Sequence, residues 1–264
     1  MAKLELRNQS IVLTGASRGI GAALARALAA KGARLALCAR GSAELDKLAA
    51  ELGASPVAVD LRDDAEVVRG IDRARDALGR IDVLINNAGV AHQAPFLSLD
   101  PTGVRDEIEL NYLAAVRTVR AVLPEMLARR SGTILNVSSV LGTVAGPSVA
   151  TYSASKAALD AFTFALRGEV AARGVRVVLF VAPHTSTEAG RAVRFDGVPM
   201  ARPDTVASHA LRALERAPRR AFSGVGNRLL VACARLSPAL GDWLMANTTR
   251  ALLAEAHRPS PPRR

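Results

Sequence analysis

Apolar residues along the chain alternate between two kinds of pattern. Short runs rich in valine, isoleucine and leucine occupy 10–15, 34–39, 56–60, 81–87, 132–139 and 175–182. Between these runs, apolar residues recur with helical spacing near 19–31, 43–52, 64–78, 103–129 and 152–173. Continuous runs are typical of parallel strands that are covered by helices on both faces. The alternation therefore predicts an α/β protein with a Rossmann-type, doubly wound parallel sheet, which binds ligands beyond the carboxyl ends of its strands.

The alternation ends after the sixth run. Residues 184–203 show no clear periodicity and contain two glycines and two prolines, which predicts a substrate loop over the same rim of the sheet. A helical pattern near 203–216 and a short apolar run near 220–223 follow. We therefore expect one Rossmann-type catalytic domain over residues 1–225.

The last part of the chain returns to helical patterns. We expect residues 226–256 to form a helical extension of the same domain. Within it, Ser237 and Pro238 have the residue types that cap and begin a helix. The tail 257–264 is rich in proline and arginine, and we expect it to be disordered.

Composition favours a cytoplasmic protein with a large core. Half of the 264 residues are hydrophobic, which is enough to bury a sizeable interior. The two cysteines, Cys38 and Cys233, both lie among apolar residues and are expected to be core thiols of a reducing compartment. No apolar run approaches the roughly 20 residues of a membrane span, and the first residues lead directly into a strand pattern rather than a signal peptide.

The net charge of +11 is concentrated toward the C-terminus. Residues 201–264 hold 11 arginines against 4 acidic residues. A nucleic-acid partner is not expected, because aromatic residues are few and no recognition motif is present. A solvated basic face is the simplest interpretation. Attraction to an anionic membrane surface or to an acidic carrier is the alternative, so peripheral membrane association stays open.

A glycine-rich turn follows the first predicted strand. The stretch TGASRGIG has glycines at 15, 19 and 21, which allow a sharp turn, close approach of a pyrophosphate and close packing of the next helix. The amide groups at that helix N-terminus favour an anion. Placed between a strand and a helix near the start of the chain, this turn predicts a dinucleotide site.

The end of the second predicted strand favours NADPH over NADH. NAD sites usually have an acidic residue there, which accepts a hydrogen bond from the 2′-hydroxyl of the ribose. Here the strand ends in Cys38-Ala39-Arg40, with no carboxylate before Glu44. Arg40 and Arg18 are both suited to a 2′-phosphate. Asp60 and its neighbour Leu61, which end the third strand, would flank the adenine.

The ordered motifs together resemble a classical short-chain dehydrogenase/reductase. After the glycine turn come Asp60, NNAG (86–89), Asn111, NVSS (136–139) and Tyr152-Ser-Ala-Ser-Lys156, and the resemblance spans residues 8 to about 190. It implies the catalytic residues Asn111, Ser139, Tyr152 and Lys156, with Ser138 as the less favoured serine. It also implies a cofactor site and no metal. The expected cofactor-binding residues are Gly15, Ser17, Arg18, Gly19, Ile20, Gly21, Arg40, Asp60, Leu61, Asn87, Ala88, Gly89, Tyr152, Lys156, Pro183, Thr185 and Thr187.

The chemistry of carbonyl reduction requires these residue types. Reduction places hydride on the carbon and a proton on the oxygen, and an unperturbed phenol with a pKa near 10 is a slow proton relay at neutral pH. Lys156 lies one helical turn from Tyr152, and its ammonium is expected to lower the pKa of the phenol. Ser139 would hold the substrate oxygen, and Asn111 would hold a water that links Lys156 to solvent.

One position departs from the family pattern. The family usually has Pro-Gly after the sixth strand, whereas this chain has Ala182-Pro183, and proline lacks the backbone N–H. The same replacement occurs in 3-ketosphinganine reductases, which this chain loosely resembles in its long apolar C-terminal segment as well. His184 is either a substrate contact or an exposed loop residue.

The C-terminal segment suggests the substrate class. Apolar residues and arginines alternate through 228–256, and the segment either packs against the domain or a second subunit, or borders a groove for an acyl chain. We expect a ketone or 3-oxo substrate that is lipid-like or carrier-bound, with a small ketone as the alternative. A nucleotide-sensing or scaffolding protein without turnover is the alternative of another class. A homodimer or homotetramer is expected from the resemblance.

Overall fold

The computed structural model describes residues 3–250. At its centre lies a sheet of seven parallel strands in the order β3-β2-β1-β4-β5-β6-β7. The strands are β1 (Ser10–Thr14), β2 (Arg34–Ala39), β3 (Ser55–Ala58), β4 (Val83–Asn86), β5 (Gly132–Ser139), β6 (Val175–Ala182) and β7 (Arg220–Phe222). This order, with its crossovers on both sides, confirms the predicted doubly wound Rossmann-type fold.

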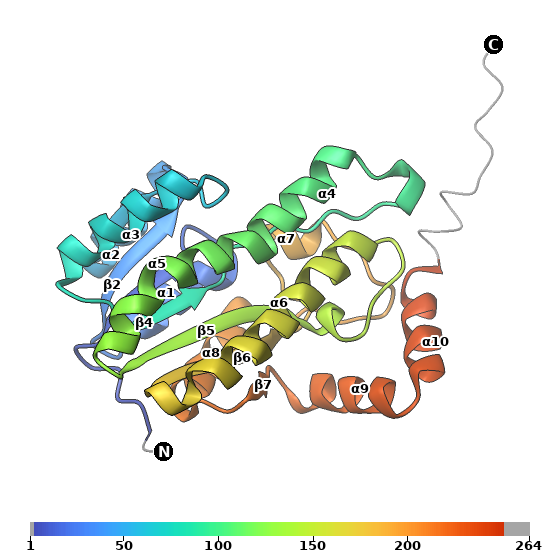
Figure 1. Cartoon of the computed structure of the whole chain (residues 1–264). Coiled ribbons are helices and arrows are strands. Elements are labelled where there is room, and N and C mark those ends of the chain that lie inside the picture. The colour runs from blue at the N-terminus through green and yellow to red at the C-terminus, as the bar shows by residue number, and fades with distance from the viewer. Residues whose placement is uncertain (1–2, 251–264) are drawn as a thin grey trace, which may run out of the picture.

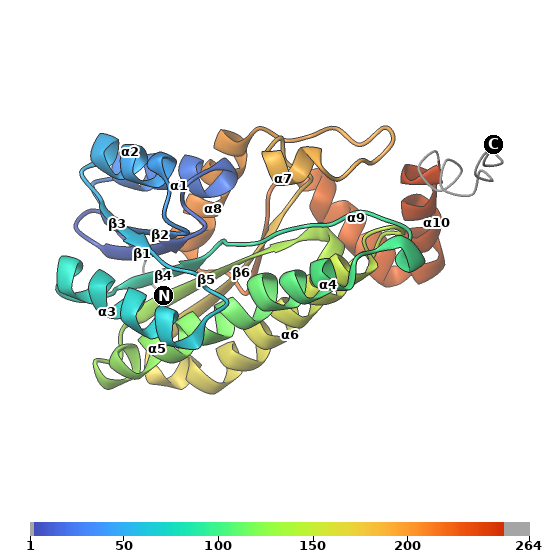
Figure 2. The same ribbon diagram turned by 90° about the horizontal axis from the view of Figure 1, so that it is seen from above.

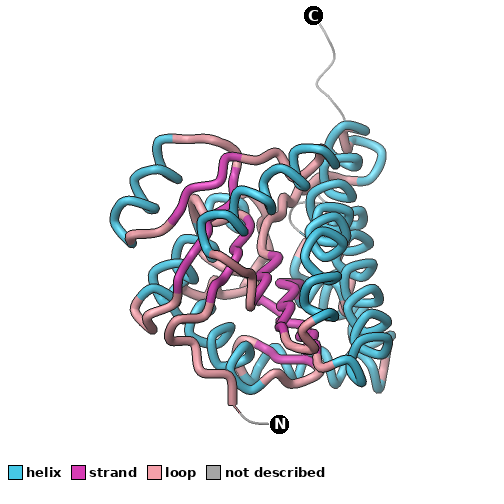
Figure 3. Tube along the Cα trace, turned by 60° about the vertical axis from the view of Figure 1, so that its left-hand side comes forward, coloured by secondary structure: helices cyan, strands magenta, loops and turns pink. Residues whose placement is uncertain are grey.

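Helices cover both faces of the sheet (Figure 1). They are α1 (Gly19–Ala29), α2 (Ala43–Leu52), α3 (Asp64–Leu78), α4 (Pro101–Ile108), α5 (Ala114–Ala128), α6 (Ala150–Val170), α7 (Glu188–Arg191), α8 (Pro203–Arg216), α9 (Val225–Leu236) and α10 (Pro238–Thr248). Seen from above, α1, α2 and α8 lie on one side and α3, α5 and α6 on the other (Figure 2). The strands run between these two layers (Figure 3). Each layer buries its own apolar cluster against the sheet.

The strand and helix bounds agree closely with those expected from the sequence, with one informative exception. The helical pattern near 103–129 is not a single α-helix, because α4 and α5 are joined by a π-helical turn, η2 (Glu109–Leu113). Such turns are rare and are frequent at functional sites. The turn contains Asn111.

The predicted loop 184–203 is largely irregular, as expected. It differs in holding the short helix α7 and in being tied down at Thr185, which pairs with Ala201 in an isolated parallel bridge. The Thr187 hydroxyl starts α7 by accepting a hydrogen bond from the Gly190 amide at 2.9 Å. The loop is thus anchored at both ends next to the rim.

The C-terminal extension forms two helices that meet at Pro238. Proline is at the first turn of α10 as predicted, but the Ser237 side chain makes no capping hydrogen bond. The extension lies beyond the carboxyl ends of the strands (Figures 1 and 2). Val231 and Met245 are buried there in a third apolar cluster that includes residues of β6 and of the turn η3 (Val140–Gly142).

The extension also corrects the prediction that both cysteines lie in the core. Cys38 is buried in β2, but Cys233 is exposed, because α9 turns only one side toward the protein. The end of the predicted extension, 251–256, and the tail 257–264 lie outside the described residues.

Candidate active site

A cleft of about 1280 Å³ opens at the carboxyl ends of the strands. It is lined by the β1–α1 turn, the ends of β4, β5 and β6, the start of α6, the loop after β6, and α9 and α10. Every residue predicted for catalysis or cofactor binding lines this cleft except Asn111. The structure therefore gathers the predicted residues around one cleft at the expected edge of the sheet.

The glycine turn forms a narrow cradle at one end of the cleft. Gly15 and Gly19 have φ angles of +65° and +59°, which favour glycine strongly. A Cβ on Gly21 would lie 2.0 Å from the Gly15 carbonyl oxygen. The Asn87 side chain donates to the carbonyls of Thr14 and Gly15 at 3.0 and 3.1 Å, so the end of β4 braces the turn. This bare backbone fits a dinucleotide pyrophosphate.

The two arginines expected near the 2′-position of the ribose both line the cleft, but they differ in their contacts. Arg40 is exposed at the end of β2. Arg18 is ion-paired with Glu188 at the start of α7, and both side chains are mostly exposed. The loop after β6 therefore reaches across to the glycine turn, and Arg18 has to leave or share this partner when it contacts a phosphate.

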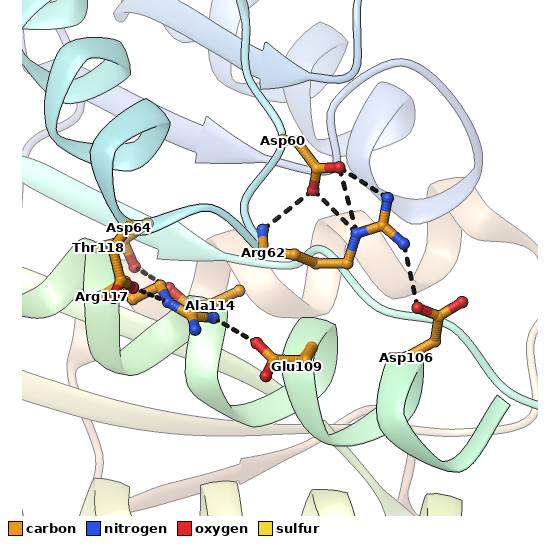
Figure 4. Close-up of polar contacts among 8 residues, drawn as sticks. All are labelled: Asp60, Arg62, Asp64, Asp106, Glu109, Ala114, Arg117 and Thr118. Carbon is orange, nitrogen blue, oxygen red and sulfur yellow. Dashed lines mark hydrogen bonds and ion pairs between the residues drawn. The ribbon is translucent and has the colours of Figure 1, made fainter. Parts of the chain in front are cut away.

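A third arginine at this end was missed by the sequence reasoning. Arg62 donates to both carboxylate oxygens of Asp60, and it reaches Asp106 on α4 at 3.0 Å (Figure 4). The hydrogen bonds from Arg62 hold the pKa of Asp60 below its usual range. A neighbouring network in the same view joins Arg117 to Asp64 and Glu109. The signal for Arg62 was its position two residues after Asp60 in a predicted cofactor segment.

The residues predicted for catalysis meet where β5 faces α6. Tyr152 and Lys156 are one turn apart on α6, and the Lys156 Nζ lies 6.0 Å from the centroid of the Tyr152 ring. Lys156 is 5% exposed, and its Nζ donates to the Val137 carbonyl at 3.2 Å. Ser139, at the end of β5, accepts a hydrogen bond from the Leu141 amide and lies close enough to Tyr152 to lower the pKa of its phenol. The structure thus brings Ser139, Tyr152 and Lys156 together as predicted.

The neighbouring serine has a different role. Both Ser138 and Ser139 border the cleft, but successive residues of a strand point to opposite faces. The Ser138 hydroxyl donates to the Asp160 carboxylate. It is committed to that contact, which supports Ser139 as the substrate-facing hydroxyl.

Asn111 is buried beside the cleft and hydrogen-bonds to the backbone of Val90. Its side chain is 1% exposed and exchanges hydrogen bonds with the amide and carbonyl of Val90 at 2.8 and 2.9 Å, and it also donates to Ser155. A Cβ on Gly89 would lie 2.8 Å from Asn111 Oδ1 and 3.4 Å from Lys156 Nζ. Asn111 and Lys156 therefore both abut Gly89, although Asn111 does not line the cleft.

The protonation of the site is governed mainly by burial. Burial raises the pKa of Tyr152 to about 12; the nearby Ser139 side chain opposes this, and the charge of Glu107 adds to it. Burial lowers the pKa of Lys156 to about 8, which the charge of Asp160 opposes. The expectation that Lys156 makes the phenol more acidic stays a prediction, because in the protein alone burial has the largest effect on the pKa of Tyr152 and the ammonium hydrogen-bonds to the strand.

Glu107 was not foreseen as part of this site. Its side chain is fully buried on α4, and it accepts hydrogen bonds from the His92 amide at 2.7 Å and from the Thr151 hydroxyl. The His92 ring nitrogen Nδ1 lies 3.5 Å from the same carboxylate. No local motif marks such a contact, since α4 and α6 are far apart in sequence.

The loop after β6 supplies the cover of the site. Pro183 accepts a hydrogen bond on its carbonyl from the Thr185 hydroxyl at 2.8 Å, and Thr187 lies against Gly19. His184 is tied to the Gly190 carbonyl through Nε2 at 2.8 Å, and its ring meets the edge of Phe195. His184 thus holds the loop together and is only partly exposed; it also lines the cleft, so a contact with substrate stays a prediction.

The far end of the cleft is apolar and was not assigned by the sequence residue by residue. It is formed by side chains from η3, the loop after β6, α9 and α10. These are Leu141, Val193, Phe195, Leu230, Leu244 and Met245. The C-terminal extension therefore borders the same cleft as the glycine turn.

Comparison with known proteins agrees with this site. The model of the family described as short chain dehydrogenase matches residues 9–196. The chain belongs to the short-chain dehydrogenase family. The match ends within the loop 184–203, so α8, α9 and α10 lie outside it.

Individual members of the short-chain dehydrogenase family resemble the chain over much of its length. Dehydrogenase/reductase SDR family member 7B of Bos taurus is 34% identical over 73% of this chain, which spans 63% of that protein. Oxidoreductase UcpA of Salmonella typhimurium is 41% identical over 66% of the chain and 68% of its own length. Ketoacyl reductase HetN of a Nostoc species is 35% identical over 71% of the chain and 67% of its own.

A solved structure extends the similarity to three dimensions. The 3-ketoacyl-(acyl-carrier-protein) reductase of Brucella melitensis, complexed with NADH, superposes with a TM-score of 0.77. The match covers 83% of this chain and 98% of that one, at 26% identity. Among the described residues of our protein, none of the helices is long and apolar enough to cross a membrane.

Proposed function

We propose that this protein is an NADPH-dependent carbonyl reductase for a substrate with an apolar chain. The observation that carries the proposal is the position of Ser139, Tyr152 and Lys156 in the middle of one cleft. The glycine cradle lies at one end of this cleft and the apolar end formed with α9 and α10 lies at the other. The cleft thus offers a place for a dinucleotide and for a long substrate on opposite sides of the same hydroxyl groups.

The residues of the chain have distinct tasks in this reaction. The glycine turn, Asn87 and the loop at Thr185 to Thr187 would hold the cofactor. When bound, the nicotinamide supplies the hydride for reduction or accepts it in the reverse reaction. Ser139 donates a hydrogen bond to the carbonyl oxygen, and Tyr152 donates the proton that this oxygen takes up. Lys156 stabilises the phenolate that remains, because an opposite charge close by favours the ionised form.

The raised pKa of Tyr152 suits this direction. With a pKa of about 12, the phenol keeps its proton at neutral pH and is ready to act as an acid. The alkoxide that forms during reduction is a much stronger base than a phenolate, so proton transfer to it is favourable. Lys156, with a pKa of about 8, is mainly charged at pH 7 and can stabilise the product phenolate.

The arginines support NADPH. Arg40 and Arg18 line the adenosine end of the cleft, and no carboxylate follows Ala39 at the end of β2 until Glu44. Guanidinium groups match a 2′-phosphate in geometry and charge. The Brucella relative is described with NADH, so the cofactor preference has to be measured on this chain.

The apolar end supports a lipid-like 3-oxo substrate. Leu230 on α9, Leu244 and Met245 on α10 and Phe195 of the loop all line the cleft. Burying a methylene group contributes about 0.8 kcal/mol, so each further two carbons of a chain that enters this end should lower KM noticeably. The ketoacyl reductase names of two relatives are consistent with such a substrate.

The test is a substrate series with matched cofactors. Oxidation of NADPH and of NADH is followed with 3-oxoacyl thioesters and simple ketones of graded chain length, for the wild type and for Tyr152→Phe. We expect kcat/KM to rise with chain length, to be higher with NADPH and to be lost in Tyr152→Phe, which should still bind NADPH in a calorimeter. Equal binding with no turnover by either protein would instead favour a nucleotide-sensing role.

The proposal extends to assembly and location. Leu229 and Leu236 on α9 and Trp243 on α10 are 58%, 88% and 62% exposed, on an extension that also carries Arg228 and Arg235. Such a basic, apolar surface would suit peripheral contact of a cytoplasmic protein with an anionic membrane. Flotation with anionic and neutral vesicles tests this contact, and light scattering tests the homodimer or homotetramer.

A further inference from the structure

The end of β5 is connected to α6 by three consecutive contacts. The Val137 carbonyl accepts a hydrogen bond from Lys156, Ser138 donates to Asp160, and Ser139 lies near enough to Tyr152 to lower the pKa of its phenol. The three helix residues are spaced four apart, so they lie on one face of α6, one turn after another. The site therefore has a third helix position, Asp160, directly below the two residues already described.

Asp160 is a buried carboxylate with a complete set of partners. Its side chain is 8% exposed, and besides Ser138 it contacts the Thr143 hydroxyl at 3.4 Å and the Arg220 guanidinium at 3.5 Å. Arg220 comes from β7 and is itself only 12% exposed, with its guanidinium 4.8 Å from the Phe164 ring. One carboxylate thus joins β5, the turn after it, α6 and β7.

These contacts fix the residues that carry the proposed reaction. Ser138 and Thr143 stand on either side of Ser139 and of the turn that follows it. Holding both of them limits how far Ser139 can move relative to Tyr152. Positional errors of an ångström at such a hydroxyl reduce rates by orders of magnitude.

We propose that Asp160 is a positioning residue of the carbonyl reduction, which holds Ser139 through Ser138 and Thr143 and is the counter-charge of Lys156. The inference rests on the proposed function for its catalytic part. The charge part is independent of turnover, because it concerns the amine of Lys156 in the protein alone. Both parts follow from the same carboxylate.

The nearest positive charges to the Asp160 carboxylate come from Lys156 and Arg220. Lys156 lies one turn before it on α6, and Arg220 faces it from β7. Arg219 and Arg235 lie close enough to act on Arg220, and Tyr152 and Glu107 lie on the other side of Lys156. Asp160 is the charged group that raises the pKa of Lys156 against the effect of burial. Removal of its charge should therefore lower the pKa of that amine.

The experiment uses the small number of lysines in the chain. There are four, Lys3, Lys31, Lys47 and Lys156, so the side-chain signals of lysine-labelled protein can be assigned by single substitutions and titrated by NMR. In the wild type the Lys156 signal should titrate near pH 8. In Asp160→Asn, which keeps the shape and an acceptor for Ser138, we expect the midpoint to fall by about one pH unit.

Matched variants distinguish the effect of the Asp160 charge from its effect on the position of Ser139. Ser138→Ala removes a hydrogen bond and keeps the carboxylate, so it should leave the Lys156 midpoint unchanged and lower kcat for the ketone by about tenfold. In a pH profile of kcat/KM, the alkaline decline should move to lower pH in Asp160→Asn only. If Asp160→Asn does not fold, because Arg220 loses its partner, Asp160→Asn/Arg220→Met is compared with Arg220→Met, so that both proteins lack the Arg220 charge, and the lysine midpoint should be lower in the double variant.

Each part of the proposal has a result that would overturn it. An unchanged Lys156 midpoint in folded Asp160→Asn, or equal midpoints in Arg220→Met and the double variant, overturns the role as counter-charge. An equal shift in Ser138→Ala would overturn it as well, by tracing the effect to geometry. Full activity of Ser138→Ala together with Thr143→Val would overturn the positioning role. Failure of the proposed function has another signature, namely no turnover by the wild type while the lysine shift in Asp160→Asn persists.

Discussion

Replacing Lys156 should raise the free energy of unfolding and abolish the reductase activity. Burial lowers the pKa of its amine from 10.5 to about 8, so the folded protein holds this proton less tightly than the unfolded chain. The resulting penalty is complete below pH 8, where it amounts to about 3 kcal/mol, and it disappears as the pH rises toward 10.5. Lys156→Met removes the charge and keeps most of the volume. It leaves the Val137 carbonyl without its donor, a loss of about 1 kcal/mol.

We therefore expect Lys156→Met to be more stable than the wild type by about 2 kcal/mol at pH 7 and to lack reductase activity. The measurement is urea unfolding at pH 7 and again at pH 9.5, where the gain should have largely vanished. Lys47→Met, at an exposed helix position, is the control and should change stability little at either pH. A variant that is no more stable than the wild type at pH 7, or a gain that stays constant with pH, would refute the reasoning.

Three further predictions concern the two ends of the cleft. Gly21→Ala should abolish NADPH binding in calorimetry without unfolding the protein, because its Cβ would lie 2.0 Å from the Gly15 carbonyl oxygen; retained affinity would show that the turn is not the cradle. Arg40→Ala should raise KM for NADPH by about tenfold, as expected for the loss of one charge-assisted hydrogen bond, and should leave KM for NADH unchanged. Leu244→Gln, in the apolar end, should raise KM for long-chain 3-oxo substrates by about tenfold and leave short ketones unaffected. The exposed neighbour in Trp243→Gln serves as its control.

The sequence was sufficient where the chemistry lies within one short segment. The glycine turn at 14–21 follows from local backbone geometry, since only glycine adopts the required φ values without strain. Tyr152 and Lys156 share a helix, so their spacing alone places them on one face. In the same way, the alternation of apolar runs and helical periods was enough to predict the parallel sheet and its binding edge.

The sequence was insufficient where a contact joins distant segments. Arg62 and Asp106 are 44 positions apart, and Asp160 and Arg220 are 60 apart. Nothing local marks either pair. Cys233 shows the same limit, because an apolar neighbourhood in sequence does not determine which side of α9 faces the protein.

The pKa of Tyr152 illustrates why such contacts matter for the chemistry. The spacing to Lys156 by itself suggests an acidified phenol, whereas burial and the charge of Glu107 raise the pKa of Tyr152 to about 12. Glu107 reaches the site because the π-helical turn joins α4 to α5 and because Thr151, next to Tyr152, donates to its carboxylate. For alcohol oxidation the phenol would first have to release its proton beside this buried negative charge. For ketone reduction the proton is already in place, and the charge of Glu107 favours keeping it there until the substrate oxygen becomes basic enough to take it. Burial of Tyr152, with the charge of Glu107 adding to it, therefore explains why the phenol holds its proton in the protein alone, which the spacing of Tyr152 and Lys156 does not reveal.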